Sequence, residues 1–308
     1  MSAAFAEQLL GVSPEAALVI FVAALARLGP LLWLTPFPGG RLVPSLIKVP
    51  LAALLALLVY PQLMPAASKL AEGGLLMFLA IVVKEAMIGA AMGFIVALVF
   101  HAAAAAGFLA DTARGATNGQ VFVPQTGQRS TALGALFFQL ALVLFLALGG
   151  HRLLLAAIGR SYLVLPLDVF PDTHSLGVFA FFVARLTGEM ILFAVSLAAP
   201  VIAALLLTDI SLGWVNRFAP QINVFFLAMP AKALLGIAVL VVAVGGVAVA
   251  LPASMEASLA QLQRALGILA GHKGFGRGVA FGDSAITGCC SRGSLNGGEI
   301  LAILWPLG

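Results

Sequence analysis

Charged residues inside the long apolar runs of this chain are the first candidates for chemistry, because a charge among apolar neighbours is costly and usually has a partner or a function. Arg185 and Glu189 are four residues apart, which places them on one face of a helix and predicts an ion pair between them. Lys84 and Glu85 are consecutive, so they point in different directions on a helix and are expected to need separate partners, which a neighbouring subunit could supply. The chemistry that these spacings indicate is charge pairing.

The sequence lacks the spacings that catalytic and metal-binding sites require. It contains no H-E-x-x-H, no G-x-S-x-G, no phosphate-binding P-loop and no cluster of Cys and His with metal-ligand spacing. The apolar runs also leave few polar residues from which a site could be assembled. We therefore expect a protein that is not an enzyme and that holds no metal and no cofactor.

A polar stretch, residues 208–226, separates two long apolar runs. Its guanidinium, carboxamides and proline need partners in protein or water at membrane depth, because lipid offers none. Asp209 and Lys232 flank the proline, and we expect a polar cluster there to hold the segment in shape. The residues of the stretch that we expect to contact other protein are Arg217, Pro220, Gln221 and Asn223.

Composition indicates which elements must position these residues. Hydrophobic residues make up 62% and charged residues 9% of the chain, whereas charged residues are about a quarter of ordinary soluble proteins. These values predict an integral membrane protein. The net charge of +4 is spread along the chain, without the clustered basic face that nucleic-acid binding needs.

Six apolar runs are long enough to be membrane helices, each of which needs about 20 residues. They cover residues 16–35, 46–64, 75–109, 132–149, 178–207 and 222–251. We therefore expect an all-α membrane protein of about six long, partly broken hydrophobic helices within residues 1–270. Residues 271–308 are rich in glycine without a sustained helical pattern and are expected to form a disordered tail.

Some of these runs do not fit one simple crossing of a membrane. The run 75–109 would extend about 50 Å as a straight helix, against a hydrocarbon core of about 30 Å. Pro200 and Pro230 lie inside the last two runs, where a missing N–H and a ring clash are expected to break the helices. Broken helices at membrane depth need shielding by protein.

Small residues in the third run predict close helix packing. Gly89 and Gly93 are four residues apart, and small residues at this spacing let two helix backbones approach each other. The contact could lie within the chain or between subunits, and the sequence leaves both open.

The segment from Asp111 to Ser130 combines glycines and polar amides with the apolar trio Val121, Phe122 and Val123. Glycine allows backbone shapes that other residues resist. A flexible polar loop with an apolar tip could close a channel, because a hydrophobic constriction bars water by dewetting. An exposed connecting loop is the alternative.

Taken in order, several short motifs give the chain a resemblance to the FliR/SctT export-apparatus proteins of bacterial type III secretion systems, both flagellar and virulence-associated. The resemblance runs from about residue 19 to residue 262. Its landmarks are Arg27-Leu28-Gly29-Pro30, Lys84-Glu85 with Gly89, Asp111-Thr112-Ala113-Arg114-Gly115, Gly149-Gly150, Ser161-Tyr162 with Pro166, Ala198-Ala199-Pro200, Leu212-Gly213, and Arg217-Phe218-Ala219-Pro220-Gln221-Ile222-Asn223-Val224-Phe225.

The resemblance implies a core export-gate subunit in the bacterial inner membrane, through which unfolded substrates pass. Its implied partners are subunits of the FliP/SctR and FliQ/SctS types, a switch protein of the FlhB/SctU type, and the exported substrates. The loop after the third run would contribute to the pore plug, through Gly115, Gly119, Gln120, Phe122, Pro124, Gln125, Gly127 and Gln128. Contacts between subunits would involve Lys84, Glu85, Gly89, Gly93, Asp111, Arg217, Pro220, Gln221, Asn223 and Lys232.

Two further choices remain at this stage. Residues 223–227, followed by Pro230 and Lys232, look more like the virulence injectisome branch than the flagellar branch. An ion-coupled secondary transporter is the alternative function, since broken helices that carry Asp, Glu and Lys also describe carriers. A carrier is expected to show related halves, and residues 16–109 and 132–251 show no repeat.

Overall fold

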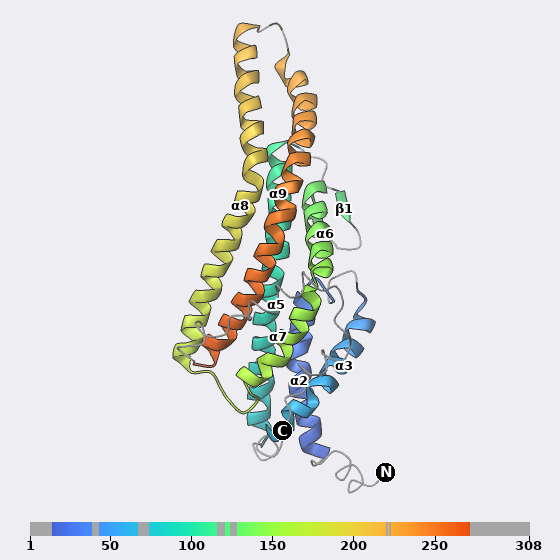
Figure 1. The fold of residues 1–308 in the computed structure, drawn as a ribbon, viewed down its shortest axis with the longest axis vertical. Coiled ribbons are helices and arrows are strands. Elements are labelled where there is room, and N and C mark those ends of the chain that lie inside the picture. Colours follow the sequence, from blue (N-terminus) through green and yellow to red (C-terminus); the bar gives the residue numbers. More distant parts are fainter. Residues whose placement is uncertain are drawn as a thin grey trace, which may run out of the picture.

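The computed structural model describes residues 14–38, 43–66, 74–115, 121–123, 128–219, 221 and 223–271. Helices dominate this part of the chain, which confirms the predicted all-α class (Figure 1). The helices are α2 (Pro14–Leu34), α3 (Ser45–Leu63), the short 3-10 helix η1 (Met64–Ala66), α5 (Gly74–Ala113), α6 (Ala132–Ala147), α7 (Gly150–Val164), α8 (Thr173–Phe218) and α9 (Val224–Leu269). Two three-residue strands, β1 (Val121–Val123) and β2 (Gln128–Ser130), form an antiparallel pair.

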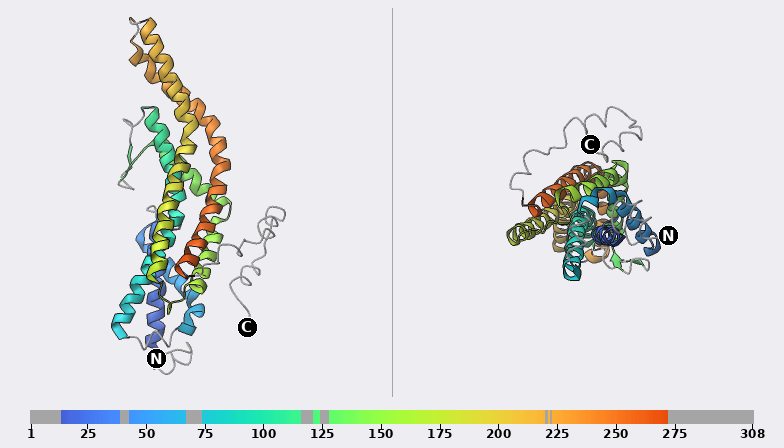
Figure 2. Two further views of the ribbon diagram at one scale, coloured as in Figure 1. Left: turned by 90° about the vertical axis from the view of Figure 1, so that its left-hand side faces the viewer. Right: turned by 90° about the horizontal axis from the view of Figure 1, so that it is seen from below.

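The helices form a bundle from which one helical pair extends. α5 lies at the centre of the bundle and packs against α2, α6, α8 and α9. α8 and α9 are antiparallel neighbours, and the ends of both helices next to residues 219–223 project beyond the rest of the described chain (Figures 1 and 2). We call this projecting part, residues 206–235, the arm.

Four helical segments in the described residues are long and apolar enough to cross a membrane. They are Ala16–Leu34, Leu46–Leu63, Gly74–Ala113 and Thr173–Phe218. The pair α6 and α7 makes a fifth if the two count as one broken span, because the helices meet at an angle of 72°. The predicted runs are therefore real helices, but α7 lies outside all six of them because Arg152 and Arg160 interrupt its apolar pattern.

The predicted breaks at Pro200 and Pro230 are wrong. Both prolines lie inside continuous helices, α8 and α9, and the chain leaves the helical path only around residues 219–223. A single proline removes one backbone hydrogen bond and bends the axis without ending the helix, and α8 and α9 pack against each other. Figure 2 shows the α8/α9 pair changing direction partway along its length.

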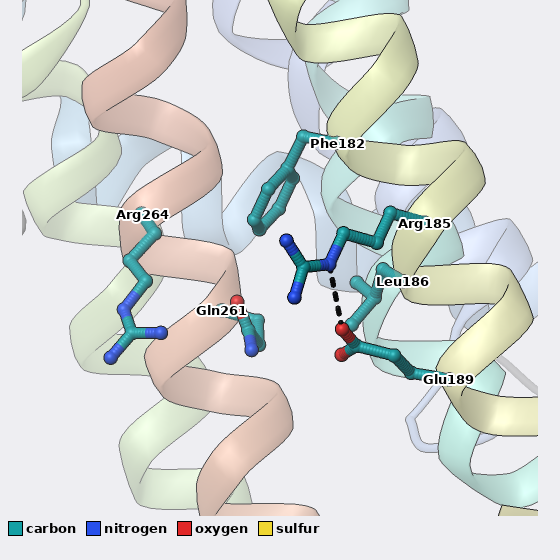
Figure 3. A pocket seen from close by; sticks show the side chains of 6 residues that line it. All are labelled: Phe182, Arg185, Leu186, Glu189, Gln261 and Arg264. Atoms are coloured by element: carbon teal, nitrogen blue, oxygen red, sulfur yellow. Dashed lines mark hydrogen bonds and ion pairs between the residues drawn. The ribbon is translucent and has the colours of Figure 1, made fainter.

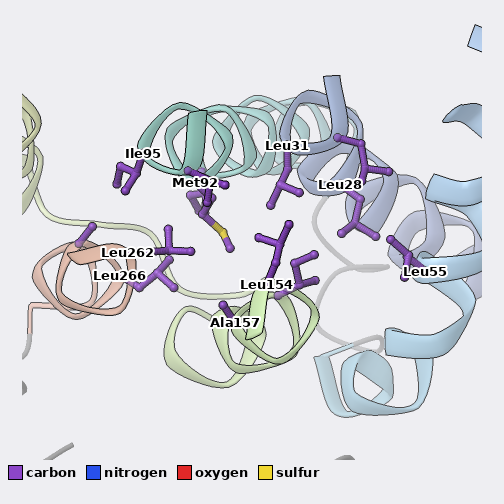
Figure 4. Close-up of a cluster of buried hydrophobic side chains, with 14 of the residues drawn as sticks. Leu28, Leu31, Leu55, Met92, Ile95, Leu154, Ala157, Leu262 and Leu266 are labelled. Carbon is purple, nitrogen blue, oxygen red and sulfur yellow. The ribbon is translucent and has the colours of Figure 1, made fainter. Parts of the chain in front are cut away.

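Glycines bring α2 and α5 into close contact. A methyl group built on Gly89 would overlap the carbonyl oxygen of Arg27, and one built on Gly93 would lie 2.9 Å from the carbonyl oxygen of Leu31. Of the two possibilities that the sequence left open, the structure thus shows packing within the chain at both glycines. Around this contact lies one apolar core to which α2, α5, α7 and α9 contribute (Figure 4). Its members in that view include Leu28, Met92, Leu154 and Leu262.

Candidate functional site

Arg27 of α2 lies completely inside the bundle and is held by three elements. Its Nε donates to Oε2 of Glu85 on α5. Nη1 donates to Oγ of Ser161 at 3.1 Å, and Nη2 donates to the carbonyl oxygen of Leu165 at 2.9 Å. The guanidinium carbon lies 4.0 Å from the ring centre of Tyr162, a cation–π contact that gains strength away from water.

Lys84 extends the same network to the chain that follows α7. Its Nζ donates to the carbonyl oxygens of Leu167 at 2.8 Å, Val169 at 3.0 Å and Pro166 at 3.3 Å. The same nitrogen lies 3.0 Å from Oε1 of Glu85. One carboxylate and three carbonyls thus surround this ammonium group.

The expectation that Lys84 and Glu85 need separate partners is met in part, because Glu85 pairs with Arg27 and Lys84 binds backbone carbonyls, but the two residues also pair with each other. Consecutive residues start in different directions, but the long Lys84 side chain curves back so that its head reaches the neighbouring carboxylate. Both residues are buried within this chain. Arg27 was predicted only as part of a family motif, although a lone arginine in the first apolar run indicates a need for a buried partner.

A second polar group ties the end of α5 to the start of α6. Asp111 Oδ2 accepts a hydrogen bond from the backbone N–H of Leu133 at 2.8 Å, and Oδ1 pairs with Arg114. Thr131 caps α6 by accepting a hydrogen bond from the N–H of Gly134 at 3.2 Å. Residues 115–130, which we call the loop segment, therefore leave and return at one polar base.

The loop segment contains structure that the sequence analysis missed. β1 and β2 pair with Val121 opposite Ser130 and Val123 opposite Gln128, so Phe122 and Gln128 lie in strands. Three-residue strands are at the lower limit of strand length, which explains why no alternating pattern revealed them. Gly115 has φ +74°, a left-handed backbone suited to glycine. The predicted plug residues Gly119, Gln120, Pro124, Gln125 and Gly127 lie outside the described residues.

The arm brings together part of the predicted polar cluster. Nζ of Lys232 on α9 lies 2.5 Å from Oδ1 of Asp209 on α8, which confirms that these residues interact. α8 continues to Phe218, so the polar stretch is helical for most of its length. Arg217, Gln221 and Asn223 are exposed at the turn, and Pro220 lies outside the described residues.

Bulky apolar side chains are exposed along the arm. They occur on both helices, and three of them are exposed at 83% (Phe218), 74% (Phe226) and 72% (Leu234). Others are Leu207, Ile210 and Trp214. A group of exposed apolar side chains of this kind indicates contact with protein or membrane.

A half-open recess lies between the lower parts of α8 and α9 (Figure 3). Nε of Arg185 lies 2.9 Å from Oε1 of Glu189, which confirms the predicted ion pair. Both charges are well exposed, at 72% and 44%. Phe182 and Gln261 complete the inner wall, while Arg264 points away from the pair in this view. The recess therefore holds a neutralised pair of charges.

Comparison with known proteins matches this chain to a family described as bacterial export proteins, family 1, over residues 18–257. The flagellar biosynthetic protein FliR of Bacillus subtilis (strain 168) is 32% identical over 209 residues, which cover 67% of this chain and 79% of the relative. The surface presentation of antigens protein SpaR of Shigella flexneri is 31% identical over 222 residues, 71% of this chain and 83% of the relative.

A further relative is the Yop proteins translocation protein T of Yersinia pestis, 32% identical over 188 residues, 61% of this chain and 71% of the relative. The family match includes the buried Arg27 network, the base of the loop segment and the arm. It also agrees with the resemblance that the short motifs predicted. The chain belongs to the bacterial export proteins of family 1.

Proposed function

We propose that this chain is a core subunit of the export gate of a bacterial type III secretion system, in the inner membrane. It assembles with subunits of the FliP/SctR and FliQ/SctS types and works beside a switch protein of the FlhB/SctU type. Unfolded substrate proteins pass through the pore that these subunits enclose. The chain shapes and closes the passage, and it performs no chemical reaction.

The observation that carries this proposal is the exposed apolar surface of the arm. A free protein in water would hide residues such as Phe218 and Phe226, which are 83% and 74% exposed. Lipid alone is a poor partner for the same surface, because Arg217 and Asn223 are exposed beside them and lipid cannot satisfy polar groups. Other protein subunits can cover the apolar side chains and also bind the polar ones.

The loop segment is the proposed closure of the pore. The residues on either side of it are held by Asp111, Arg114 and Thr131, through the ion pair and the two hydrogen bonds described above. An apolar constriction can stop ions without filling the pore completely. Phe122, which lies in β1, is the proposed apolar tip.

Sequence details favour the virulence branch over the flagellar branch. Residues 223–227, with Pro230 and Lys232, are the basis for this preference. Among the relatives, FliR is named for flagellar biosynthesis and the Yop proteins translocation protein T for translocation of Yop proteins. The branch assignment therefore rests on the arm sequence.

Copurification tests the proposed function. The full-length chain is extracted from its native bacterial membrane in mild detergent, and the proteins that accompany it are identified by mass. We expect two smaller apolar proteins of the FliP/SctR and FliQ/SctS types, in a fixed ratio to this chain. Recovery of the chain alone or as a homo-oligomer would refute the proposal and favour the transporter alternative.

A further inference from the structure

Arg114 packs against α9 at a position where α9 has no side chain. A methyl group built on Gly236 would overlap Cδ of Arg114 and lie 2.9 Å from its Cγ. Gly236 is buried, and the Arg114 side chain is only 12% exposed. The absent side chain at Gly236 therefore leaves a gap in the surface of α9, here called the seat, which holds Cγ and Cδ of Arg114.

The head of the same arginine is held at the base of the loop segment. Its Nη2 pairs with Asp111 Oδ1, and Asp111 Oδ2 accepts the hydrogen bond from the N–H of Leu133 in the first turn of α6. A chain of contacts thus runs from Gly236 through Arg114 and Asp111 to Leu133. It joins α9 to both ends of the loop segment.

A small apolar cluster follows the same route. Ala110 of α5 and Leu133 of α6 are buried against Val201 and Leu205 of α8, and Val239 of α9 packs on the cluster. Val239 lies three residues after the seat, which is less than one helical turn. Since this cluster is separate from the main core, the helix ends on both sides of the loop segment share a small apolar contact of their own with the α8/α9 pair.

We propose that Arg114 and Gly236 are positioning residues that couple the arm to the loop segment. A displacement of the arm moves α9, and the seated arginine transmits that movement to Asp111 and to the start of α6. This inference rests on the proposed function, in which partner subunits cover the arm and the loop segment closes the pore. It adds a route by which contact with those partners alters the closure.

The test uses the purified assembly with the full-length chain. Gly236→Ala places a methyl group on the seat and displaces Arg114, and packing an extra methyl group into a filled site usually has a measurable cost. Gly245→Ala is the matched control, because Gly245 lies on the same helix and a methyl group there meets nothing within 4 Å. Arg114→Ala removes the side chain without any overlap and serves as the second variant.

Two quantities are measured for each variant. Hydrogen exchange of peptides that contain Leu133 reports on the base of the loop segment, and ion conductance of the closed assembly in a planar bilayer reports on the closure. For Gly236→Ala and for Arg114→Ala we expect exchange at least about fivefold faster and a raised conductance, with neither change for Gly245→Ala. In an Arg114→Ala background, Gly236→Ala should add nothing, because the side chain that it displaces is already gone.

The outcomes separate this inference from the proposed function. Unchanged exchange in Gly236→Ala and Arg114→Ala would overturn the coupling, even if shortening the loop segment opens the pore. Effects of the two substitutions that add in the double variant would overturn it as well. Faster hydrogen exchange in Gly236→Ala and Arg114→Ala would support the coupling even if the conductance of these variants is unchanged. If shortening the loop segment also leaves the conductance unchanged, the closure role is refuted.

Discussion

Glu85 is a completely buried carboxylate that lies between two cations, Arg27 and Lys84. Its charge offsets one of theirs, while Ser161 and a set of backbone carbonyls accept further hydrogen bonds from the two cations. A buried ion network of this kind adds little stability compared with an apolar core, but removal of one member leaves an uncompensated charge. The network therefore fixes how α2, α5 and the chain after α7 fit together.

Replacement of this carboxylate should be severe. Glu85→Gln keeps the shape of the side chain but leaves two buried cations without an anion, which we expect to cost about 3–5 kcal/mol. The melting temperature of the detergent-solubilised assembly measures this loss. Glu189→Gln is the control, because the exposed pair with Arg185 is worth about 1 kcal/mol or less. Equal melting temperatures for the two variants would contradict this account of the network.

Residue patterns predicted contacts well where the partners share one helix or face each other across one turn, as Asp209 and Lys232 do. The pair Arg185 and Glu189 followed directly from helical spacing, and it is confirmed. Arg27 and Glu85 are separated by 58 positions, and no local pattern indicates that two such residues meet. Lys84 shows a further limit, because the direction in which a side chain starts does not fix where a long flexible one ends.

The apolar runs predicted that these segments are helices and approximately where they lie, because burial and membrane contact both require a long apolar sequence. The same reasoning failed for Pro200 and Pro230, since neighbouring helices can hold a helix together across one missing hydrogen bond. It also failed for β1 and β2, which depend on pairing with each other more than on their own sequences. The loop segment is thus the element about which the sequence revealed least.

Shortening the loop segment tests its role directly. Deletion of residues 119–125 removes β1, while Asp111 and Thr131 at the base are kept. We expect a clear rise in ion conductance through the assembled, closed pore, because the apolar constriction is lost. Conductance equal to that of the unaltered assembly would rule out a role in closure. A deletion of residues 300–306, far along the chain from the pore elements, is the control.

The molecule as a whole consists of a well-packed bundle and an arm whose surface is incomplete. The bundle buries the ion network of Arg27, Lys84 and Glu85 together with one large apolar core, and the arm exposes apolar and polar side chains together beside the turn at 219–223. Family membership and the apolar runs together account for this division, because a subunit of a larger machine needs one part that is stable and another that binds. The sequence could not indicate which helices project, since that depends on how α8 and α9 bend together.

Arg217 is the residue at which the arm can be tested. It is exposed in the last turn of α8, and a guanidinium there can bind carboxylates or carbonyls of a partner. Arg217→Ala should lower the yield of intact assembly by about fivefold or more, as loss of a charged hydrogen bond of roughly 1–3 kcal/mol predicts. Yield is measured as the partner-to-chain ratio after purification. A normal ratio would show that Arg217 makes no contact across subunits, and Arg217→Lys, which keeps the charge, is the control.

Exposed aromatic rings at Trp214, Phe218 and Phe226 also bear on how the cell must produce this protein. A newly made copy exposes these apolar rings as soon as α8 and α9 are complete. Copies made in excess of their companions would stick to one another or be destroyed by quality-control proteases. In the proposed assembly, we therefore expect the host to make all the components together, close in time and place.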